Sequence, residues 1–198
     1  MKKNVAVFLD RDGTINEEVG YLDSLEKLKI IPTAEEAIKL INSHGMKAVV
    51  ISNQAGVARG LFTEEFVNKV NNHLLDLLKQ KGALIDKFYY CPHHPKEGKG
   101  IYLQKCSCRK PAPGMLLQAA QELNIDLLNS YFIGDRFIDM EAAKKVGAKG
   151  ILVKTGYGED LLQDDGPDQA TAEGTPDFVA ADILEAVQWI LKDRKHIK

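Results

Sequence analysis

The sequence predicts an α/β protein built on a doubly wound parallel sheet. Short apolar runs rich in β-branched and aromatic residues alternate with segments of helical periodicity along the chain. Strands that alternate with helices form parallel sheets covered by helices on both faces. The chain has 198 residues and no internal repeat or Pro/Ser-rich linker, so we expect a single domain over residues 1–198.

The first strand is expected at residues 5–9, where the run VAVFL is too short to form a helix alone. Asp10 and Asp12 follow it, and residues two apart in an extended chain point to the same side. Gly13 allows a sharp turn there. Two carboxylates so close repel each other, which indicates a metal ion or a proton-carrying role, although a polar turn is the ordinary alternative.

The later strands follow from further short apolar runs, and the last of them is expected at an edge of the sheet. They are expected over residues 46–51, 86–91, 131–134, 150–153 and 177–180. The acidic, Gly/Pro-containing segment from 156 to 176 is expected to be a surface excursion.

The helices follow from apolar residues at three- and four-residue spacing between these strands. They are expected over residues 34–44, 64–82, 111–123 and 142–146, and from 183 onwards. Thr33, Thr63 and Asp182 stand where they could cap three of these helices, because their side-chain oxygens can accept a bond from a free backbone N–H.

Parallel sheets place their functional sites beyond the carboxyl ends of the strands. Asp10, Ser52, Cys91 and Asp135 each stand within a residue or so of a predicted strand end. Four stretches far apart in the sequence are therefore expected to meet at one rim of the sheet.

The residues at this rim suit phosphoryl transfer. The pair Asp10 and Asp12, together with Asp135 and Asp139, supplies hard oxygen ligands, which favour Mg²⁺ over zinc or copper. A divalent cation can screen the repulsion between a carboxylate nucleophile and a phosphate.

Donors and cations stand near these acids. Ser52 and Asn53 offer a hydroxyl and an amide, and Arg109 and Lys110 come directly before a predicted helix, whose N-terminus also favours anions. Lys110 can take up the charge of a transferring phosphoryl group.

All three cysteines of the chain stand with a histidine in a loop of about residues 91–108 that lacks a core of its own. The pattern C-x-H…C-x-C matches a closed tetrahedral zinc site with the ligands Cys91, His93, Cys106 and Cys108. His94 is an alternative to His93, and incidental cytosolic thiols are the alternative to a metal site. Zinc would fasten the loop and position Arg109 and Lys110.

Composition restricts the partners. Lys+Arg 26 against Asp+Glu 28 leaves a net charge of -2, which lacks the polycationic signature of nucleic-acid or anionic-membrane binding, so a small molecule is expected. The first apolar run is shorter than a signal-peptide core, and no stretch reaches the length of a membrane span. Three clustered cysteines fit a reducing compartment, so we expect a cytoplasmic protein. The sequence does not define the oligomeric state, and we expect a monomer.

The chain resembles the haloacid dehalogenase superfamily of phosphatases over nearly its whole length. The resemblance is carried, in order, by Asp10-Arg11-Asp12-Gly13-Thr14, Ser52-Asn53-Gln54, Lys110 and Gly134-Asp135. It implies that Asp10 is a nucleophile forming an aspartyl-phosphate and that Asp12 is the acid and then the base, with Ser52 and Lys110 completing the catalytic set.

The same resemblance implies an Mg²⁺ site. The ion would be held by the Asp10 carboxylate, the Asp12 backbone carbonyl and Asp135, with Asp139 supporting them. Members often insert a cap domain between the motifs, but both intervals are too short for a full cap here, so substrate choice is expected to fall to loops.

Within this superfamily, the chain is similar to the D-glycero-D-manno-heptose 1,7-bisphosphate 7-phosphatase family. The zinc loop, Gly20-Tyr21 and the run from Ser52 to Gly60 carry that similarity. It implies removal of the 7-phosphate of a phosphorylated sugar in nucleotide-activated heptose biosynthesis, which serves lipopolysaccharide. Asn53 would bind the substrate, Arg59 the retained phosphate, and Arg109 the sugar or that phosphate. Arg136 is a departure, because the family often has lysine there.

Other functions stay open at this point. Histidinol-phosphate phosphatases share the zinc loop and the four motifs, but usually lack the continuation Ala58-Arg59-Gly60. A phospho-acceptor signalling domain would also use an acidic cluster on a doubly wound sheet, and a zinc-dependent binding module is a third class. A dinucleotide-binding dehydrogenase is disfavoured because the glycines at 156 and 158 are not followed by the third one.

Overall fold

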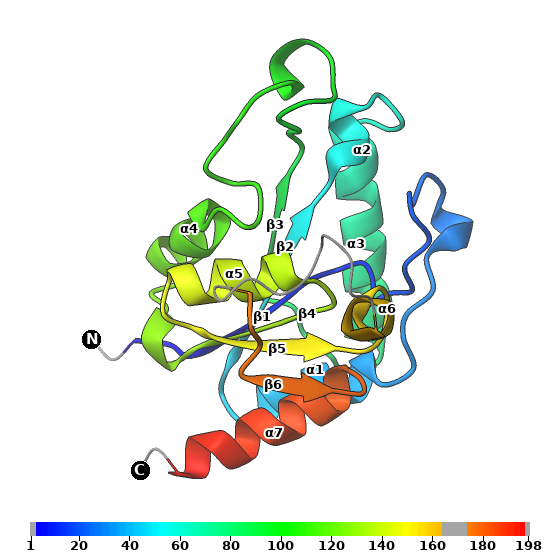
Figure 1. Cartoon of the computed structure of the whole chain (residues 1–198). Coiled ribbons are helices and arrows are strands. Elements are labelled where there is room, and N and C mark those ends of the chain that lie inside the picture. The colour runs from blue at the N-terminus through cyan, green and yellow to red at the C-terminus, as the bar shows by residue number, and fades with distance from the viewer. Residues whose placement is uncertain (1–2, 164–173, 197–198) are drawn as a thin grey trace.

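The computed structural model describes residues 3–163 and 174–196, with a six-stranded parallel sheet at the centre (Figure 1). The strand order is β3-β2-β1-β4-β5-β6. The strands are β1 (Ala6–Leu9), β2 (Lys47–Asn53), β3 (Lys87–Cys91), β4 (Tyr131–Gly134), β5 (Lys149–Val153) and β6 (Phe178–Ala180). The prediction of a doubly wound parallel sheet is confirmed, and β6 is an edge strand as expected.

Helices cover both faces of this sheet. They are α1 (Ala34–Ser43), α2 (Ala55–Ala58), α3 (Glu64–Gln80), α4 (Gly114–Glu122), α5 (Phe137–Lys145), α6 (Gly158–Gln163) and α7 (Ile183–His196). Buried side chains of α1, α3 and α7 share one apolar cluster with one face of the sheet. Those of α4 and α5 share a second cluster with the other face.

The central strand β1 explains why its sequence is apolar without interruption. Val7 and Leu9 belong to one cluster, and Ala6 and Phe8 to the other. All four are fully buried. Burying a side chain as large as Leu or Phe contributes about 1.5–3 kcal/mol, so both faces of the strand favour apolar residues.

Of the two threonines expected to cap helices, only Thr63 does so. Its backbone is extended, and its hydroxyl accepts a bond from the backbone N–H of Phe66. Thr33 already has helical backbone angles, with φ -85° and ψ -9°, and its side chain makes no capping bond. An N-cap oxygen reaches the first free N–H groups when its residue stays outside the helical region, so the prediction for Thr33 is wrong. Asp182 caps α7 through bonds to the N–H groups of Leu184 and Glu185.

Two helices, α5 and α4, begin at other residues than predicted, and the short helices α2 and α6 were not predicted. Helix α5 begins at Phe137, five residues earlier than expected, because Asp139 accepts a bond from the backbone N–H of Arg136 and closes its first turn. Helix α4 begins only at Gly114, since the preceding segment holds two prolines. Helix α6 was missed within the expected surface excursion, of which residues 164–173 lie outside the described part.

The topology brings the predicted rim together. Strand β1 lies between β2 and β4, so the chain reverses its direction of winding at this point, where α/β sheets place ligands. Asp10, Ser52 and Asp135 stand at the carboxyl ends of these three strands. In the described residues, the first interval expected to lack a cap holds only the short 3-10 turn η1 (Leu25–Lys27), α1 and β2. The second holds only α2, α3, β3 and a second 3-10 turn, η2 (Gly100–Tyr102).

Candidate active site

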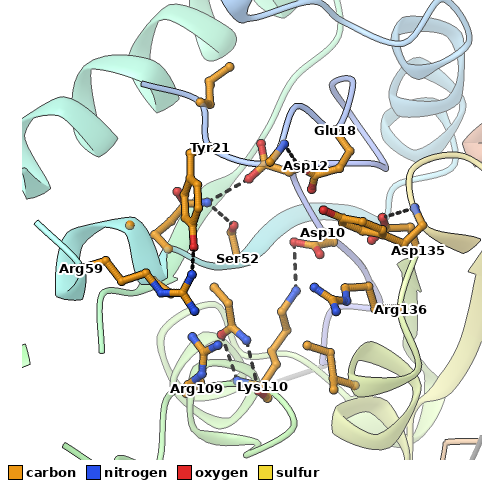
Figure 2. A pocket seen from close by; sticks show the side chains of 18 of the residues that line it. Asp10, Asp12, Glu18, Tyr21, Ser52, Arg59, Arg109, Lys110, Asp135 and Arg136 are labelled. Carbon is orange, nitrogen blue, oxygen red and sulfur yellow. Dashed lines mark hydrogen bonds and ion pairs between the residues drawn. The ribbon is translucent and has the colours of Figure 1, made fainter. Parts of the chain in front are cut away.

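A pocket of about 300 Å³ lies at the carboxyl ends of β1, β2 and β4 (Figure 2). All the predicted catalytic, substrate-binding and magnesium residues line it, namely Asp10, Asp12, Ser52, Asn53, Arg59, Arg109, Lys110 and Asp135. The wall also includes residues to which no function was assigned, namely Glu18, Tyr21, Gln54, Phe62, Arg136, Ile138 and Tyr157.

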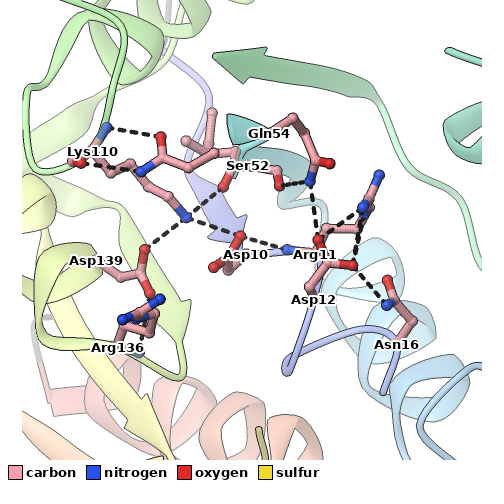
Figure 3. Close-up of polar contacts among 11 residues, drawn as sticks. Asp10, Arg11, Asp12, Asn16, Ser52, Gln54, Lys110, Arg136 and Asp139 are labelled. Atoms are coloured by element: carbon pink, nitrogen blue, oxygen red, sulfur yellow. Dashed lines mark hydrogen bonds and ion pairs between the residues drawn. The ribbon is translucent and has the colours of Figure 1, made fainter. Parts of the chain in front are cut away.

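Asp10 lies on the floor of this pocket with 8 % of its surface exposed. Its carboxylate accepts a bond of 2.8 Å from the backbone N–H of Arg11 and pairs with the Lys110 ammonium at 2.9 Å (Figure 3). Burial raises the pKa of Asp10 to about 7, and the charge of Asp139 adds to the rise, although Lys110 opposes it. A further cation beside Asp10 would therefore favour the ionised form that a nucleophile needs.

Asp10, Asp135 and Asp139 form a cluster of acids. One oxygen of each carboxylate lies within 4.8 Å of the others. Burial, followed by the charges of Asp10 and Asp139, raises the pKa of Asp135 well above its ordinary value. Lys110 pairs with two of the three carboxylates, Asp10 and Asp139, so negative charge remains and this donor set is suited to a hard divalent cation.

Two glycines make room for Asp135. Gly13 and Gly156 have positive φ angles of 78° and 60°, and a Cβ at either would lie 2.1 Å from an oxygen of Asp135. The backbone N–H of Tyr157 donates to the same oxygen at 2.9 Å. The turn after β1 and the turn after β5 therefore fix this carboxylate between them.

Lys110 holds the acids together from the opposite side. Its ammonium pairs with Asp139 at 2.7 Å and donates to the backbone carbonyl of Ile51 at 2.9 Å, while its side chain is almost fully buried. The carboxylates of Asp10 and Asp139 outweigh the effect of burial and raise the pKa of Lys110, so it stays charged. The Asn53 side chain bonds both the backbone N–H and the backbone carbonyl of Lys110, which places the lysine from β2.

Asp12 lies beside Asp10 but faces other partners (Figure 3). Burial opposes ionisation of its carboxylate, yet the Arg11 guanidinium and bonds from Arg11, Asn16 and Gln54 outweigh burial and lower its pKa. In this structure Asp12 is therefore an ionised carboxylate, and it belongs to no acid cluster found among the described residues.

Gln54 connects Asp12 to β2. Its amide donates to Asp12 at 3.0 Å and to the Ser52 hydroxyl at 2.7 Å. The two strand ends that carry the nucleophile and the hydroxyl are thus joined through one buried side chain.

Three arginines surround the mouth of the pocket (Figure 2). Arg59 bonds the Tyr21 hydroxyl and pairs with Glu97 at 2.9 Å, and Arg109 donates to the backbone carbonyl of His93 at 3.2 Å. The Arg136 guanidinium stacks on Tyr157, 4.9 Å from the ring centre. Burial lowers the pKa of Arg109, and the charges of Arg59 and Arg136 act in the same direction. The mouth is therefore suited to an anion.

Three thiols and one imidazole form a second cluster in the loop after β3. Their ligand atoms lie within 4.8 Å of one another, and the members are Cys91, His93, Cys106 and Cys108. The sulfur–sulfur distances run from 3.0 to 3.5 Å, and the cysteines are free. His94 is turned away, and its Nδ1 accepts bonds from the backbone N–H groups of Lys96 and Glu97. Of the two candidate histidines, the structure places His93 with the thiols.

Arg136, Tyr157 and Glu18 were not assigned to the site from the sequence. Arg136 directly follows the predicted strand end at Asp135, so its position was a usable signal. Tyr157 follows β5 and Glu18 follows β1 by several residues, and their approach to the pocket depends on turns whose shape the sequence does not define.

Among known proteins, residues 107–186 match the HAD-hydrolase-like family model. The chain is 44% identical over 171 residues to D-glycero-beta-D-manno-heptose-1,7-bisphosphate 7-phosphatase of Pasteurella multocida (strain Pm70), covering 86% of this chain and 90% of the relative. It is 39% identical to the protein of the same name from Escherichia coli (strain K12), covering 98% of each.

Solved structures agree with these relatives. The D,D-heptose 1,7-bisphosphate phosphatase of B. bronchiseptica, complexed with magnesium and phosphate, superimposes with a TM-score of 0.80 at 31% identity. The match covers 96% of this chain and 99% of that one. None of the helices in the described residues has the length and apolar character needed to cross a membrane. The chain belongs to the D-glycero-D-manno-heptose-1,7-bisphosphate 7-phosphatase family of HAD-like hydrolases.

Proposed function

We propose that this protein is a Mg²⁺-dependent phosphatase that removes the 7-phosphate of D-glycero-D-manno-heptose 1,7-bisphosphate through an aspartyl-phosphate on Asp10. The observation that carries this proposal is the buried Asp10–Lys110 pair at the floor of a pocket with arginines at its mouth. The names of relatives 39% and 44% identical to the chain support the choice of substrate.

The acid cluster fits a magnesium ion. Hard oxygen donors converge there, and burial together with mutual repulsion raises the pKa values of Asp10 and Asp135, so a cation would relieve both. The Asp10 and Asp135 carboxylates would hold the ion together with the backbone carbonyl of Asp12, and Asp139 would support them. Bound Mg²⁺ would screen the repulsion between Asp10 and the phosphate.

Asp10 attacks phosphorus, and the bond from phosphorus to the C7 oxygen breaks as the Asp10–phosphorus bond forms. Lys110 and the Ser52 hydroxyl hold the phosphoryl oxygens during transfer. Asp12 gives its proton to the departing oxygen and then takes one from the water that hydrolyses the aspartyl-phosphate. Because Arg11 lowers the pKa of Asp12, that first proton is taken up from solvent as the doubly charged phosphate binds beside the carboxylate.

The arginines at the mouth supply the contacts for the rest of the substrate. Arg59 binds the phosphate that is retained, and Arg109 binds the sugar or that phosphate. Asn53 keeps Lys110 in place and contacts the substrate. A bisphosphate needs cations at both ends of the pocket, and this chain offers them.

The cluster of Cys91, His93, Cys106 and Cys108 fits a structural zinc ion. It has four soft or borderline ligands, its thiols are free, and its ligand atoms all lie within 4.8 Å of one another. Zinc there would join the end of β3 to the residues directly before Lys110. Its work is to position Arg109 and Lys110, and the reaction itself does not use it.

In its biological setting, we place the enzyme in the cytoplasm as a monomeric single domain, within nucleotide-activated heptose biosynthesis for lipopolysaccharide. The absence of polycationic character in a chain of net charge -2 supports a small phosphorylated sugar as its partner.

The test is phosphate release from both anomers of the heptose bisphosphate and from histidinol phosphate, with Mg²⁺ present. Heptose bisphosphate is expected to have the highest kcat/KM, and Asp10→Asn is expected to abolish turnover while the protein stays folded. Preference for histidinol phosphate would favour that alternative, and phosphorylation without turnover would favour a phospho-acceptor domain. Activity retained by Asp10→Asn would contradict the covalent mechanism.

A further inference from the structure

Arg11 is one of the largest fully buried side chains of the protein, with 2% of its surface exposed. It stands between the two aspartates of the turn after β1, and its guanidinium runs from Asp12 towards helix α3. A buried guanidinium needs partners for all of its donors, so its contacts define its position.

Two nitrogens of Arg11 donate hydrogen bonds to the Asp12 carboxylate. Its Nε donates to Asp12 Oδ1 at 3.1 Å, and one terminal nitrogen, Nη2, reaches Oδ1 at 3.0 Å and Oδ2 at 2.8 Å. Asn16 donates to Oδ1 at 2.9 Å, and Gln54 to Oδ2 at 3.0 Å. This fork sets the plane in which the carboxylate lies.

The other terminal nitrogen of Arg11 reaches helix α3. Its Nη1 donates to the Oδ1 atom of Asn71 at 3.1 Å, across 60 positions of the sequence. Asn71 is buried, with 7% of its surface exposed, and it is not among the residues that line the pocket. One buried amide on α3 therefore anchors the guanidinium that holds Asp12.

We infer that Asn71 is a positioning residue for proton transfer by Asp12, acting through Arg11. The inference rests on the acid–base role of Asp12 in the proposed function. Without the Asn71 oxygen, the guanidinium loses its anchor on α3 and the plane of the carboxylate is no longer fixed. Proton transfer depends on that orientation, and a well-placed acid or base contributes about 10²–10⁴-fold to rate.

The signature of this role is a dependence on the leaving group. The departing oxygen of a sugar phosphate becomes an alkoxide and needs a proton, whereas p-nitrophenolate leaves as a stable anion and does not. Loss of acid positioning therefore slows the first step for the sugar phosphate alone, while damage to the fold or to Asp10 slows both substrates.

The experiment compares Asn71→Leu with a matched control, Asn72→Leu, which makes the same change at the exposed next residue of α3. With enzyme in excess and Mg²⁺ present, a single turnover by rapid quench gives the rate of leaving-group release from heptose bisphosphate and from p-nitrophenyl phosphate. Asn71→Leu is expected to lower the ratio of these rates about tenfold or more, as a partial loss of the acid–base contribution, and Asn72→Leu is expected to leave the ratio unchanged.

The inference would be overturned if Asn71→Leu left the ratio of the two rates unchanged, whether or not both rates fell. It would also be overturned if Asn72→Leu lowered the ratio as much as Asn71→Leu. If Asn71→Leu does not fold, Asn71→Asp serves instead, because it keeps the volume but adds a carboxylate that competes with Asp12 for Arg11. The ratio is again expected to fall, and an unchanged ratio would overturn the inference.

The proposed function is tested separately by the wild type. Failure to cleave heptose bisphosphate would contradict that function. The ratio of leaving-group release would then be measured with glycerol 3-phosphate in place of heptose bisphosphate, because its leaving oxygen is also an alkoxide. If the protein cleaved neither heptose bisphosphate nor glycerol 3-phosphate, Asp12 would have no acid role, and the inference about Asn71 would be wrong.

Discussion

Replacing Asp10 by Asn should stabilise the magnesium-free protein at alkaline pH, although the same change removes the nucleophile. Asp10 is buried beside two other acids, and its pKa rises from 3.8 to about 7. A carboxyl whose pKa is higher in the folded than in the unfolded state disfavours folding once it ionises. Asn resembles the neutral form and avoids this penalty.

The magnitude follows from the pKa. The penalty is absent below pH 3.8, grows as pH rises, and is complete above about 7. At about 1.4 kcal/mol per pKa unit, this interval corresponds to about 4 kcal/mol. Because that pKa already includes the attraction of Lys110 for the carboxylate, we expect Asp10→Asn to gain up to about 4 kcal/mol at pH 8 and almost none at pH 4.

The assay is urea unfolding in magnesium-free buffer at pH 8, 6 and 4, followed by circular dichroism. Asp12→Asn is the matched control, and it should lower the free energy of unfolding where Asp10→Asn raises it. The reason is that the effect of Arg11 on the pKa of Asp12 is larger than the opposing effect of burial, so the pKa is lowered and the ionised form favours folding. Asp12 is partly exposed and Arg11 is buried, so removing the charge of Asp12 should cost about 1–3 kcal/mol near neutral pH. Added Mg²⁺ should stabilise the wild type more than Asp10→Asn, since the ion favours an ionised Asp10.

The reasoning about the acid cluster would be refuted if Asp10→Asn destabilised the protein at pH 8. It would also be refuted if the difference from wild type were the same at pH 8 and pH 4, because a pH-independent effect would not come from ionisation of Asp10.

Three further outcomes are expected. Cys106→Ser should lower bound zinc, measured by atomic absorption, from about one ion per chain to near zero. Limited proteolysis should then cleave the variant first within residues 92–110. Cleavage in the core first would contradict the proposal that zinc holds this loop in place. Arg59→Ala should raise KM for heptose bisphosphate at least about tenfold more than KM for a sugar monophosphate, and equal increases would favour the histidinol-phosphate alternative. Gly13→Ala should abolish detectable turnover and destabilise the fold by at least about 1–2 kcal/mol, because the residue has φ 78° and its Cβ would lie 2.1 Å from Asp135; wild-type kinetics would show that the turn is not needed.

Much of the catalytic rim could be predicted because parallel strands end at the same edge of a sheet. Once strands were predicted to end at Leu9, Ile51 and Gly134, the polar residues that follow each of them had to meet. The order of the strands was not needed for that step. The thiol cluster could also be predicted, because the spacing of the cysteines along one loop is itself a zinc-ligand pattern.

The rest depended on contacts that sequence spacing does not record. Asn71 lies 60 positions from Arg11, and they meet only because α3 packs against the sheet. His93 and His94 both fit the zinc spacing. They differ because the Nδ1 atom of His94 accepts a hydrogen bond from the backbone N–H of Glu97, which leaves His93 beside the thiols. Asp139 closes the first turn of α5 as well as facing Lys110, so the helix began earlier than its apolar pattern indicated.

The most direct test of the proposed function is a ³¹P NMR time course of D-glycero-D-manno-heptose 1,7-bisphosphate with the purified protein and Mg²⁺. Loss of the C7 phosphate signal, with the C1 phosphate retained and inorganic phosphate growing in equal amount, is the predicted result. Loss of the C1 phosphate, or an unchanged spectrum from a folded and metal-loaded protein, would contradict it.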